Sequence, residues 1–459
     1  MPLPYTARWV NDMNTPICDF VKKYSDSNPL RLHMPGHKGI DTLGFEHLDI
    51  TEISGADSLF EADGIIAESE KNAGEIFGAN TFYSTEGSSL CIRAMVHLAL
   101  MQAQREGKAP LIAAGRNAHR AFMSACALSG ADAAWIYPKH SDSYLSCPLT
   151  AEDVEEFLKK SPTMPCAVYL TSPDYLGNTV DIMSIGAVCR RFGVMLLIDN
   201  AHGAYLRFVG RHPIQLGADM CCDSAHKTLP VLTGGAYLHL RADIDRDILD
   251  NVKNVLALYG STSPSYLILQ SLDMCNKYLK DTYPRALREF IPLVRELKGA
   301  LRGMGYTIFG DEELKLTIST KPYGYRGREI AKMLENKNIH AEASDDDFVV
   351  FMLTPALGEE CIDALFTNLR HIRKRLPITA DAPGLAPCER AMSIREALLS
   401  PCETIKADKC LGRVLAQPSV SCPPAVPIAI CGERLSEQAI NAFKYYKTDY
   451  ISVVKERKD

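Results

Sequence analysis

A lysine lies among hydroxyl and imidazole groups directly after an apolar run, in the segment 223–228 with sequence DSAHKT. A lysine amine forms a Schiff base with a carbonyl compound where its surroundings allow it to lose its proton. Lys227 is that lysine, and Ser224, His226 and Thr228 carry groups that suit a phosphate. The alternative is a surface lysine in a polar turn, which the segment taken alone favours.

An aspartate at the end of another apolar run changes this balance. Asp199 follows the run 195–198, and a buried carboxylate is costly unless it is paired. In a pyridoxal phosphate site, an aspartate pairs with the ring nitrogen and makes the ring an electron sink. Ala201 is small enough to lie against a flat ring, and His202 adds a polar neighbour. The alternative is a helix-capping aspartate.

The spacing of these two residues supports a shared site. Asp199 and Lys227 are 28 residues apart, about one βαβ repeat, so both can reach the same edge of a sheet. The pair therefore predicts a pyridoxal phosphate enzyme.

Two upstream features fit the same cofactor. Gly87, Ser88 and Ser89 precede an apolar-periodic helix, and glycine and hydroxyls at a helix N-terminus bind anions such as phosphate. His119 follows the apolar run 111–114 and can stack on a flat ring. Many helices begin with serine, and a lone histidine is more often a packed structural residue, so both features depend on the others.

Two polar segments have no evident structural role. His37 lies in the sequence HMPGHKG at 33–39, and Ser261 and Ser263 lie in the hydroxyl-rich loop 261–266. The alternative for both is an irregular, solvated loop.

The elements that must position these residues alternate between residues 65 and 240. Short apolar strands separated by helices predict βαβ units and a mainly parallel sheet covered on both faces. A Gly/Ser turn is expected between the first two helices. Expected helices are 66–77, 88–106, 151–160 and 184–192; expected strands are 111–114, 133–137, 167–170, 194–198, 220–222 and 236–240.

The remaining chain predicts smaller units. A short helix is expected near 15–25, a helical region at 245–304, strands at 316–319 and 348–353, and a Pro/Ala-rich linker at 376–388. The predicted domains are an N-terminal arm (1–60), a cofactor-binding large domain (61–290), a small α+β domain (291–377) and a C-terminal domain (389–459).

Composition is that of a globular protein. The 459 residues are 46% hydrophobic and 23% charged, with a net charge of -6, which does not favour nucleic acid or a membrane surface as partner. No apolar stretch predicts a membrane span or a secretory leader. The 15 cysteines are scattered without a CxxC pair, which predicts reduced thiols in a cytoplasm and no metal site.

The joint order of these motifs resembles the Orn/Lys/Arg decarboxylase family of pyridoxal phosphate enzymes of fold type I, the aspartate aminotransferase-like α/β fold. The resemblance runs nearly end to end. The segments that carry it are HMPGHKG at 33–39, GIIAESEKNAGEIFGA at 64–79, RNAH at 116–119, TSPxYxG at 171–177, DxAHG at 199–203, SAHKTL at 224–229, TSPSY at 262–266 and PPAVP…GE at 423–433.

The resemblance implies a role for each candidate. Lys227 is the Schiff-base lysine, and His202 lies near it or near the substrate carboxylate. Asp199 binds the ring nitrogen, while Ala201 and His119 cover the two ring faces. The phosphate is held by Ser88, Ser89, Ser224 and His226. His37, Ser261 and Ser263 serve the neighbouring subunit of a homodimer or higher oligomer, and Glu433 binds the distal cation of the substrate.

The chain departs from the family pattern in three places. The phosphate loop reads STEGSS, Thr233-Gly234-Gly235 follows the lysine region, and Ala425 replaces a glycine. We expect a short form without the receiver-like N-terminal domain of the large members, which makes large decameric rings unexpected.

The resemblance implies decarboxylation of arginine, lysine or ornithine to an amine, as in polyamine biosynthesis. An aminotransferase of the same fold is one alternative, because Arg326 and Arg328 are available for an α-carboxylate. A catalytically silent homologue acting as a binding partner is another.

Overall fold

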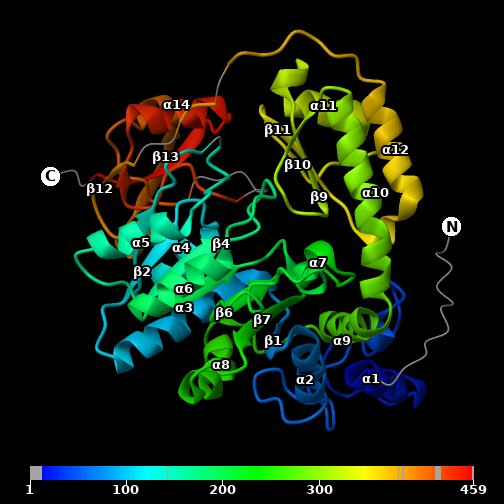
Figure 1. Ribbon diagram of the computed structural model, residues 1–459. Coiled ribbons are helices and arrows are strands. Elements are labelled where there is room, and N and C mark those ends of the chain that lie inside the picture. Colours follow the sequence, from blue (N-terminus) through cyan, green and yellow to red (C-terminus); the bar gives the residue numbers. More distant parts are fainter. Residues whose placement is uncertain (1–12, 142, 381, 385–386, 419–424, 457–459) are drawn as a thin grey trace.

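A seven-stranded sheet forms the centre of the computed structural model, which describes residues 13–141, 143–380, 382–384, 387–418 and 425–456 (Figure 1). The strand order is β1-β7-β6-β5-β4-β2-β3. Strand β7 runs antiparallel to both of its neighbours, and the other pairs are parallel. The strands are β1 (Ala79–Ser84), β2 (Leu111–Gly115), β3 (Asp132–Ile136), β4 (Ala167–Thr171), β5 (Met195–Asp199), β6 (Met220–Asp223) and β7 (Ala236–Arg241).

Helices cover both faces of this sheet, as its near-continuous apolar strands predict. One face packs against α3 (Gly87–Arg105), α4 (Arg120–Ser129) and α8 (Arg246–Tyr259). The other packs against α5 (Ala151–Lys160) and α6 (Ile182–Phe192). Alternate residues of one strand enter the two cores: Leu197 faces the first, and Leu196 and Ile198 face the second. The predicted α/β fold with a mainly parallel sheet is confirmed.

The structure differs from two local expectations. Strand β1 was not expected between the first two helices, where only a Gly/Ser turn was predicted; residues 79–84 form a strand because they pair with β7 in a distant part of the sequence. The connection between Asp199 and Lys227 carries a 3-10 helix (Ala204–Val209) in place of the α-helix of a βαβ repeat. Strands β5 and β6 are nevertheless parallel neighbours, so the expected sheet edge is shared.

A second sheet of four strands lies above the large sheet in Figure 1. Its order is β10-β11-β9-β8, and all of its pairs are antiparallel. The long helix α10 (Tyr283–Gly303) begins near the large sheet and runs alongside the four-stranded sheet (Figure 1). The other elements of this unit are β8 (Thr307–Phe309), β9 (Lys315–Ser319), β10 (Ala343–Ser344), β11 (Phe348–Met352), α11 (Gly327–Glu335) and α12 (Gly358–Arg370).

The C-terminal part forms a third unit with two small sheets, β12-β14 and β13-β15. The described residues of 376–388 lie between this unit and the four-stranded sheet and contain no helix or strand, as expected for a linker. The elements of the C-terminal unit are β12 (Glu389–Arg390), α13 (Ile394–Leu399), β13 (Cys402–Lys406), β14 (Glu433–Arg434), α14 (Glu437–Tyr445) and β15 (Tyr450–Val454). The four domain boundaries given above stay a prediction.

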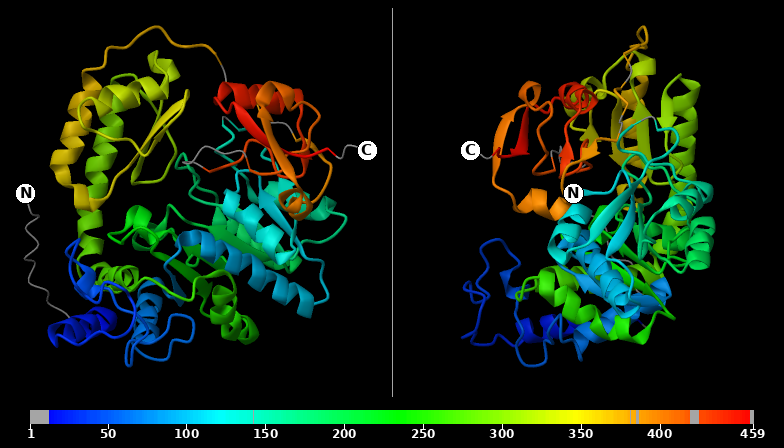
Figure 2. Two further views of the ribbon diagram at one scale, coloured as in Figure 1. Left: turned by 180° about the vertical axis from the view of Figure 1, so that it is seen from behind. Right: turned by 90° about the vertical axis from the view of Figure 1, so that its left-hand side faces the viewer.

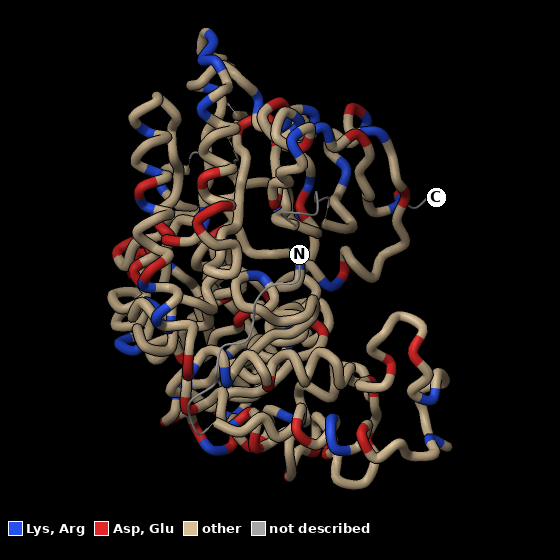
Figure 3. Tube along the Cα trace, turned by 90° about the vertical axis from the view of Figure 1, so that its right-hand side faces the viewer, with Lys and Arg blue, Asp and Glu red and all other residues tan. Residues whose placement is uncertain are grey.

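The N-terminal segment carries α1 (Pro16–Asp26) and then an irregular arm that stands away from the rest of the chain (Figure 2). Helices α2 (Ile65–Phe77) and α9 (Tyr266–Asp281) lie beside α1. Acidic and basic residues are interspersed along the trace (Figure 3). Among the described helices, none combines the length and the apolarity that crossing a bilayer requires.

Candidate active site

The carboxyl ends of three neighbouring strands open into one cavity. Thr171 ends β4, Asp199 ends β5 and pairs with Thr171, and Asp223 ends β6. The cavity has a volume of about 370 Å³. Nine of the residues predicted to hold the cofactor or act on it line this cavity: Ser88, Ser89, His119, Asp199, Ala201, His202, Ser224, His226 and Lys227. Thr228, which also carries a group that suits a phosphate, does not line it.

Lys227 lies in α7 (Ala225–Thr228), a single helical turn after β6. Its Nζ is 3.1 Å from Nε2 of His202. Burial lowers the pKa of His202 well below its ordinary value, and the nearby Lys227 lowers it further. His202 is therefore a neutral imidazole at physiological pH, and the pair is arranged to exchange a proton across one hydrogen bond.

The carboxylate of Asp199 is buried and accepts hydrogen bonds from two strong donors. The hydroxyl of Tyr169 donates over 3.0 Å, and the backbone N–H of Ala201 over 3.2 Å. The Cys222 thiol approaches at 3.7 Å. These donors offset the cost of removing a carboxylate from water at this buried place next to the cavity. A buried carboxylate at this place suits a protonated ring nitrogen.

His119 is fixed as the N-cap of α4. Its Nδ1 accepts the backbone N–H of Ala121 over 3.1 Å, which sets the orientation of the ring. Burial lowers the pKa of His119 to about 4, although the charge of Asp199 raises it. The side chain presents a neutral, flat ring to the cavity on the side of Asp199, which suits stacking on an aromatic cofactor.

An anion site occupies another wall of the cavity. Ser88 and Ser89 stand in the first turn of α3, and the Ser224 hydroxyl donates to Oγ of Ser88 over 2.8 Å. Gly87 donates its N–H to the carbonyl of Gly234 over 2.7 Å. Gly234 has a φ of +101°, and a Cβ there would lie 2.8 Å from a backbone oxygen, so this close approach requires glycine. Hydroxyls at the N-terminus of a 19-residue helix fit a phosphate.

Comparison with known proteins identifies the family of the chain. The model of the family described as "Orn/Lys/Arg decarboxylase, major domain" matches residues 15–309. The chain belongs to the Orn/Lys/Arg decarboxylase family.

Similar proteins extend the match beyond the major domain. The arginine decarboxylase of Bacillus subtilis (strain 168) is 30% identical over 461 residues, covering 93% of this chain and 92% of the relative. That of Halalkalibacterium halodurans is also 30% identical, covering 92% and 91%. In fold, the chain resembles the constitutive lysine decarboxylase of E. coli, with a TM-score of 0.77, 17% identity and coverage of 96% of this chain and 82% of that one.

The protein is a pyridoxal phosphate-dependent amino-acid decarboxylase, and the residues of the cavity fit that cofactor. An amine, a buried carboxylate, a flat imidazole and a helix N-terminus with hydroxyls are the groups that its carbonyl, ring nitrogen, ring face and phosphate require. His226 lines the phosphate wall, but its Nδ1 bonds to the carbonyl of Gly235 over 3.0 Å. Its contact with the phosphate therefore stays a prediction.

The structure brings to the cavity a carboxylate that no sequence motif indicated. Glu342 precedes β10 of the four-stranded sheet and lines the cavity. The Tyr175 hydroxyl donates to its Oε1 over 3.2 Å, and the Tyr175 ring meets the ring of His202 edge-on, with centroids 5.4 Å apart. Tyr175 belongs to a family-like motif but was given no role from the sequence.

The four residues predicted for substrate or for the neighbouring subunit do not line the cavity of this chain. Glu433 is buried and accepts the N–H of Ile430 over 2.8 Å. Ser261 donates its N–H to the carboxylate of Glu86, which does line the cavity, and the Ser263 N–H donates to the Ser261 hydroxyl. His37 lies in the N-terminal arm. Their predicted roles stay predictions.

Ala425, one of the departures from the family pattern, has a backbone conformation that favours glycine. It lines the cavity with a φ of +53°, in the left-handed region that favours glycine. Its carbonyl accepts the N–H of Arg120 at the start of α4. The neighbouring prolines of the predicted motif, Pro423 and Pro424, lie outside the described residues.

Proposed function

We propose that the protein decarboxylates a basic amino acid, with arginine as the first candidate, and that Lys227 holds the cofactor covalently through Nζ. The observation that carries the proposal is that Lys227 and the carboxylate of Glu342 line the same cavity. Relatives that match over most of their length are named arginine decarboxylases. The product would be a diamine or agmatine, in cytoplasmic polyamine biosynthesis.

Glu342 is the carboxylate best placed to bind the distal cation of the substrate. Within the described part of the chain, three carboxylates line the cavity: Glu86, Asp199 and Glu342. Asp199 is buried and already accepts hydrogen bonds from Tyr169 and Ala201, and Glu86 accepts the Ser261 N–H. From the residues that the structure describes, Glu342 accepts one hydrogen bond, from Tyr175, whereas a carboxylate has room for about four. An ammonium or guanidinium group would fill the remaining positions.

The remaining residues keep the roles that their places in the cavity support. Asp199 would hold the ring nitrogen, with Ala201 and His119 against the ring faces. When bound, the cofactor accepts the electron pair of the broken bond between Cα and the carboxylate. We assign the proton that Cα then receives to the Lys227–His202 pair, because that pair is linked by a hydrogen bond of 3.1 Å.

The structure gives less support to the aminotransferase alternative. Arg326 and Arg328 both pair with Asp346, at 3.2 and 3.7 Å, and neither lines the cavity. The test is to incubate the protein and pyridoxal phosphate with arginine, lysine or ornithine, and to measure CO2 release and amine formation. Sustained amino transfer to a 2-oxo acid without CO2 would overturn the proposal.

A second measurement separates a silent homologue from an enzyme. We expect a visible absorbance band in the wild type after addition of pyridoxal phosphate, and its loss in Lys227→Ala. A wild-type protein without such a band would favour the silent homologue.

We also propose that the protein is a homodimer and that its N-terminal arm docks on the second copy. The part of the arm that projects after α1 is residues 28–49. There, Leu30, Leu32, Ile40 and Leu43 are exposed by 84, 83, 72 and 74%. Isolated apolar side chains are ordinary at a surface, but such a run on one projecting segment marks an interaction site (Figure 2). Homodimers are the commonest assembly of soluble proteins.

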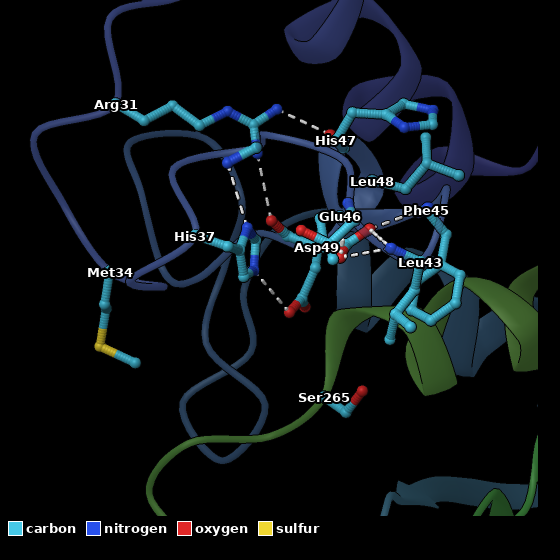
Figure 4. A network of polar contacts seen from close by, with 12 residues as sticks. Arg31, Met34, His37, Leu43, Phe45, Glu46, His47, Leu48, Asp49 and Ser265 are labelled. Carbon is cyan, nitrogen blue, oxygen red and sulfur yellow. Dashed lines mark hydrogen bonds and ion pairs between the residues drawn. The ribbon is translucent and has the colours of Figure 1, made fainter.

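A polar network gives the arm a fixed shape (Figure 4). Glu46 accepts the backbone N–H groups of Leu43, Gly44 and Phe45 over 2.8 to 3.2 Å. Arg31 donates to the carbonyls of His47 and Asp49, and Nε2 of His37 lies 3.3 Å from Asp49. A shaped apolar surface of this kind supports the prediction that His37 serves a neighbouring subunit.

Sedimentation equilibrium tests the dimer. We expect a dimer for the wild type, and dissociation for the double variant Leu30→Glu, Leu32→Glu. The matched control is Leu376→Glu, because Leu376 is 88% exposed on the linker. A monomeric wild type, or a double variant that stays dimeric, would contradict the proposal.

A further inference from the structure

Three fully buried ionisable side chains meet behind the wall of the cavity. Oδ2 of Asp223 lies 3.0 Å from Nε2 of His212 and 3.2 Å from Nε2 of His239. Asp223 ends β6, His239 lies in β7, and His212 lies in the connection before β6. The sequence predicted no such group, because the fold alone brings the three positions together.

The surrounding contacts decide which nitrogens carry protons. Oγ1 of Thr81 is 2.9 Å from Nδ1 of His239, so its hydroxyl can donate to that nitrogen. Nδ1 of His212 is buried and has no hydrogen-bond partner among the described residues, so a proton there would be unpaired. Each ring therefore carries a proton on Nε2 and donates it to Asp223.

Asp223 thus receives three donors, because Nδ2 of Asn200 also donates to its Oδ1 over 2.6 Å. Burial alone raises the pKa of this carboxyl, but the two imidazoles lower it well below its usual range. The group is a buried anion whose position is fixed from three sides.

The same three side chains could be ligands of a divalent ion, and their ligand atoms lie within 4.8 Å of one another. An ion bound to Nε2 of His212 would move the proton of that ring to Nδ1, where it has no partner in the described structure. The hydrogen-bonded anion satisfies these groups better than an ion would.

Asn200 and Asp223 connect the two strand ends that carry the cofactor residues. Asn200 directly follows Asp199, and Asp223 directly precedes Ser224. The Asn200 side chain is packed against Gly203, where a Cβ would lie 2.0 Å from Oδ1, so the amide has little freedom to turn away.

We infer that Asp223, anchored by His212 and His239, is a positioning residue that holds Asn200 and thereby fixes Asp199 relative to Ser224. It sets the separation between the carboxylate for the ring nitrogen and the hydroxyl for the phosphate. The inference rests on the cofactor roles given under the proposed function. It assigns no chemical step to Asp223, which does not line the cavity.

The test compares Asp223→Asn and Asn200→Ala with a control at another buried carboxylate. Asp273 is 1% exposed, accepts the N–H groups of Ile17 and Cys18 over 3.0 Å, and does not line the cavity. For each variant, we would measure the Kd of pyridoxal phosphate by absorbance titration of cofactor-free protein, and the thermal midpoint of that same protein.

We expect Asp223→Asn and Asn200→Ala to raise the Kd about tenfold, the effect of losing one buried hydrogen bond. Asp273→Asn should lower the thermal midpoint without a comparable change in Kd. Saturating cofactor should restore most of the activity of Asn200→Ala, which a purely catalytic residue would not allow. Should Asp223→Asn fail to fold, Asn200→Ala carries the test, because it leaves the anion and both imidazoles in place.

Two outcomes would overturn the inference. One is a Kd for pyridoxal phosphate that does not change in Asn200→Ala, or that rises no more than in Asp273→Asn when the two variants lose the same amount of thermal midpoint. The other is one equivalent of a divalent metal in the purified wild type that is lost in His212→Gln. A wild type that binds the cofactor but releases no CO2 would refute the proposed function, while the Kd comparison would still decide the role of Asp223.

Discussion

The buried imidazole of His119 makes a specific prediction about the pH dependence of stability. Unfolded His119 takes up a proton as the pH falls through its ordinary pKa of 6.5, whereas the folded residue does so only near pH 4. Between these values the unfolded state binds more protons, so this residue lowers the free energy of unfolding as the pH falls. Replacement by asparagine removes the titration, and asparagine is itself a good N-cap for α4.

The magnitude follows from the two pKa values. Each unit of difference corresponds to about 1.36 kcal/mol, and at pH 5 the linkage relation gives a loss of about 2 kcal/mol from His119. The packing change caused by His119→Asn is the same at every pH. Relative to the wild type, the variant should therefore gain about 2 kcal/mol between pH 8 and pH 5.

Urea unfolding of cofactor-free protein at the two pH values measures this difference from the shift in midpoint. His371→Asn is the matched control, because it removes a histidine from an exposed position. Stability curves of wild type and His119→Asn that stay parallel from pH 8 to pH 5 would refute the reasoning.

Three further substitutions test other parts of the site. Ala425→Gly should raise the free energy of unfolding by about 0.5 to 1 kcal/mol, because it relieves a φ of +53°. Ala429→Gly is the control: it lies at a buried position with negative φ and should lower the free energy of unfolding. Thermal midpoints that fall in both variants would contradict this prediction. Glu342→Gln should raise the KM for arginine about tenfold or more in steady-state assays, with a smaller effect on kcat, because a charged hydrogen bond is lost. Tyr169→Phe should lower the thermal stability of cofactor-free protein by about 1 to 3 kcal/mol, since Asp199 loses a buried donor; an unchanged midpoint would show that the bond is not needed.

The sequence was sufficient for the parts of the site that follow from strand ends. The apolar run before Asp199 is a buried strand, and Lys227 follows the next strand, as predicted. Because carboxyl ends of neighbouring parallel strands meet at one edge, their side chains converge without any further information. His119 follows from the same rule, since it comes after the expected strand 111–114, whereas Ser88 follows from the hydroxyls at the start of its helix.

Other parts depend on contacts between distant segments. Strand β1 has no strong pattern of its own and exists because it pairs with β7, about 160 residues later. Glu342 reaches the cavity only because the four-stranded sheet lies beside the large one, and nothing in its local sequence marks it. The group around Asp223 likewise draws on three separate segments.

The polar network of the N-terminal arm has a consequence for how two chains would meet. Because Glu46 already gathers the backbone amides of Leu43, Gly44 and Phe45, the arm is ordered before any contact is made. Ordering a flexible backbone on binding costs about 1 to 2 kcal/mol per residue, and a prefolded arm avoids most of that entropic cost. Association would then resemble the docking of rigid bodies, with a rate limited by the orientation of the encounter.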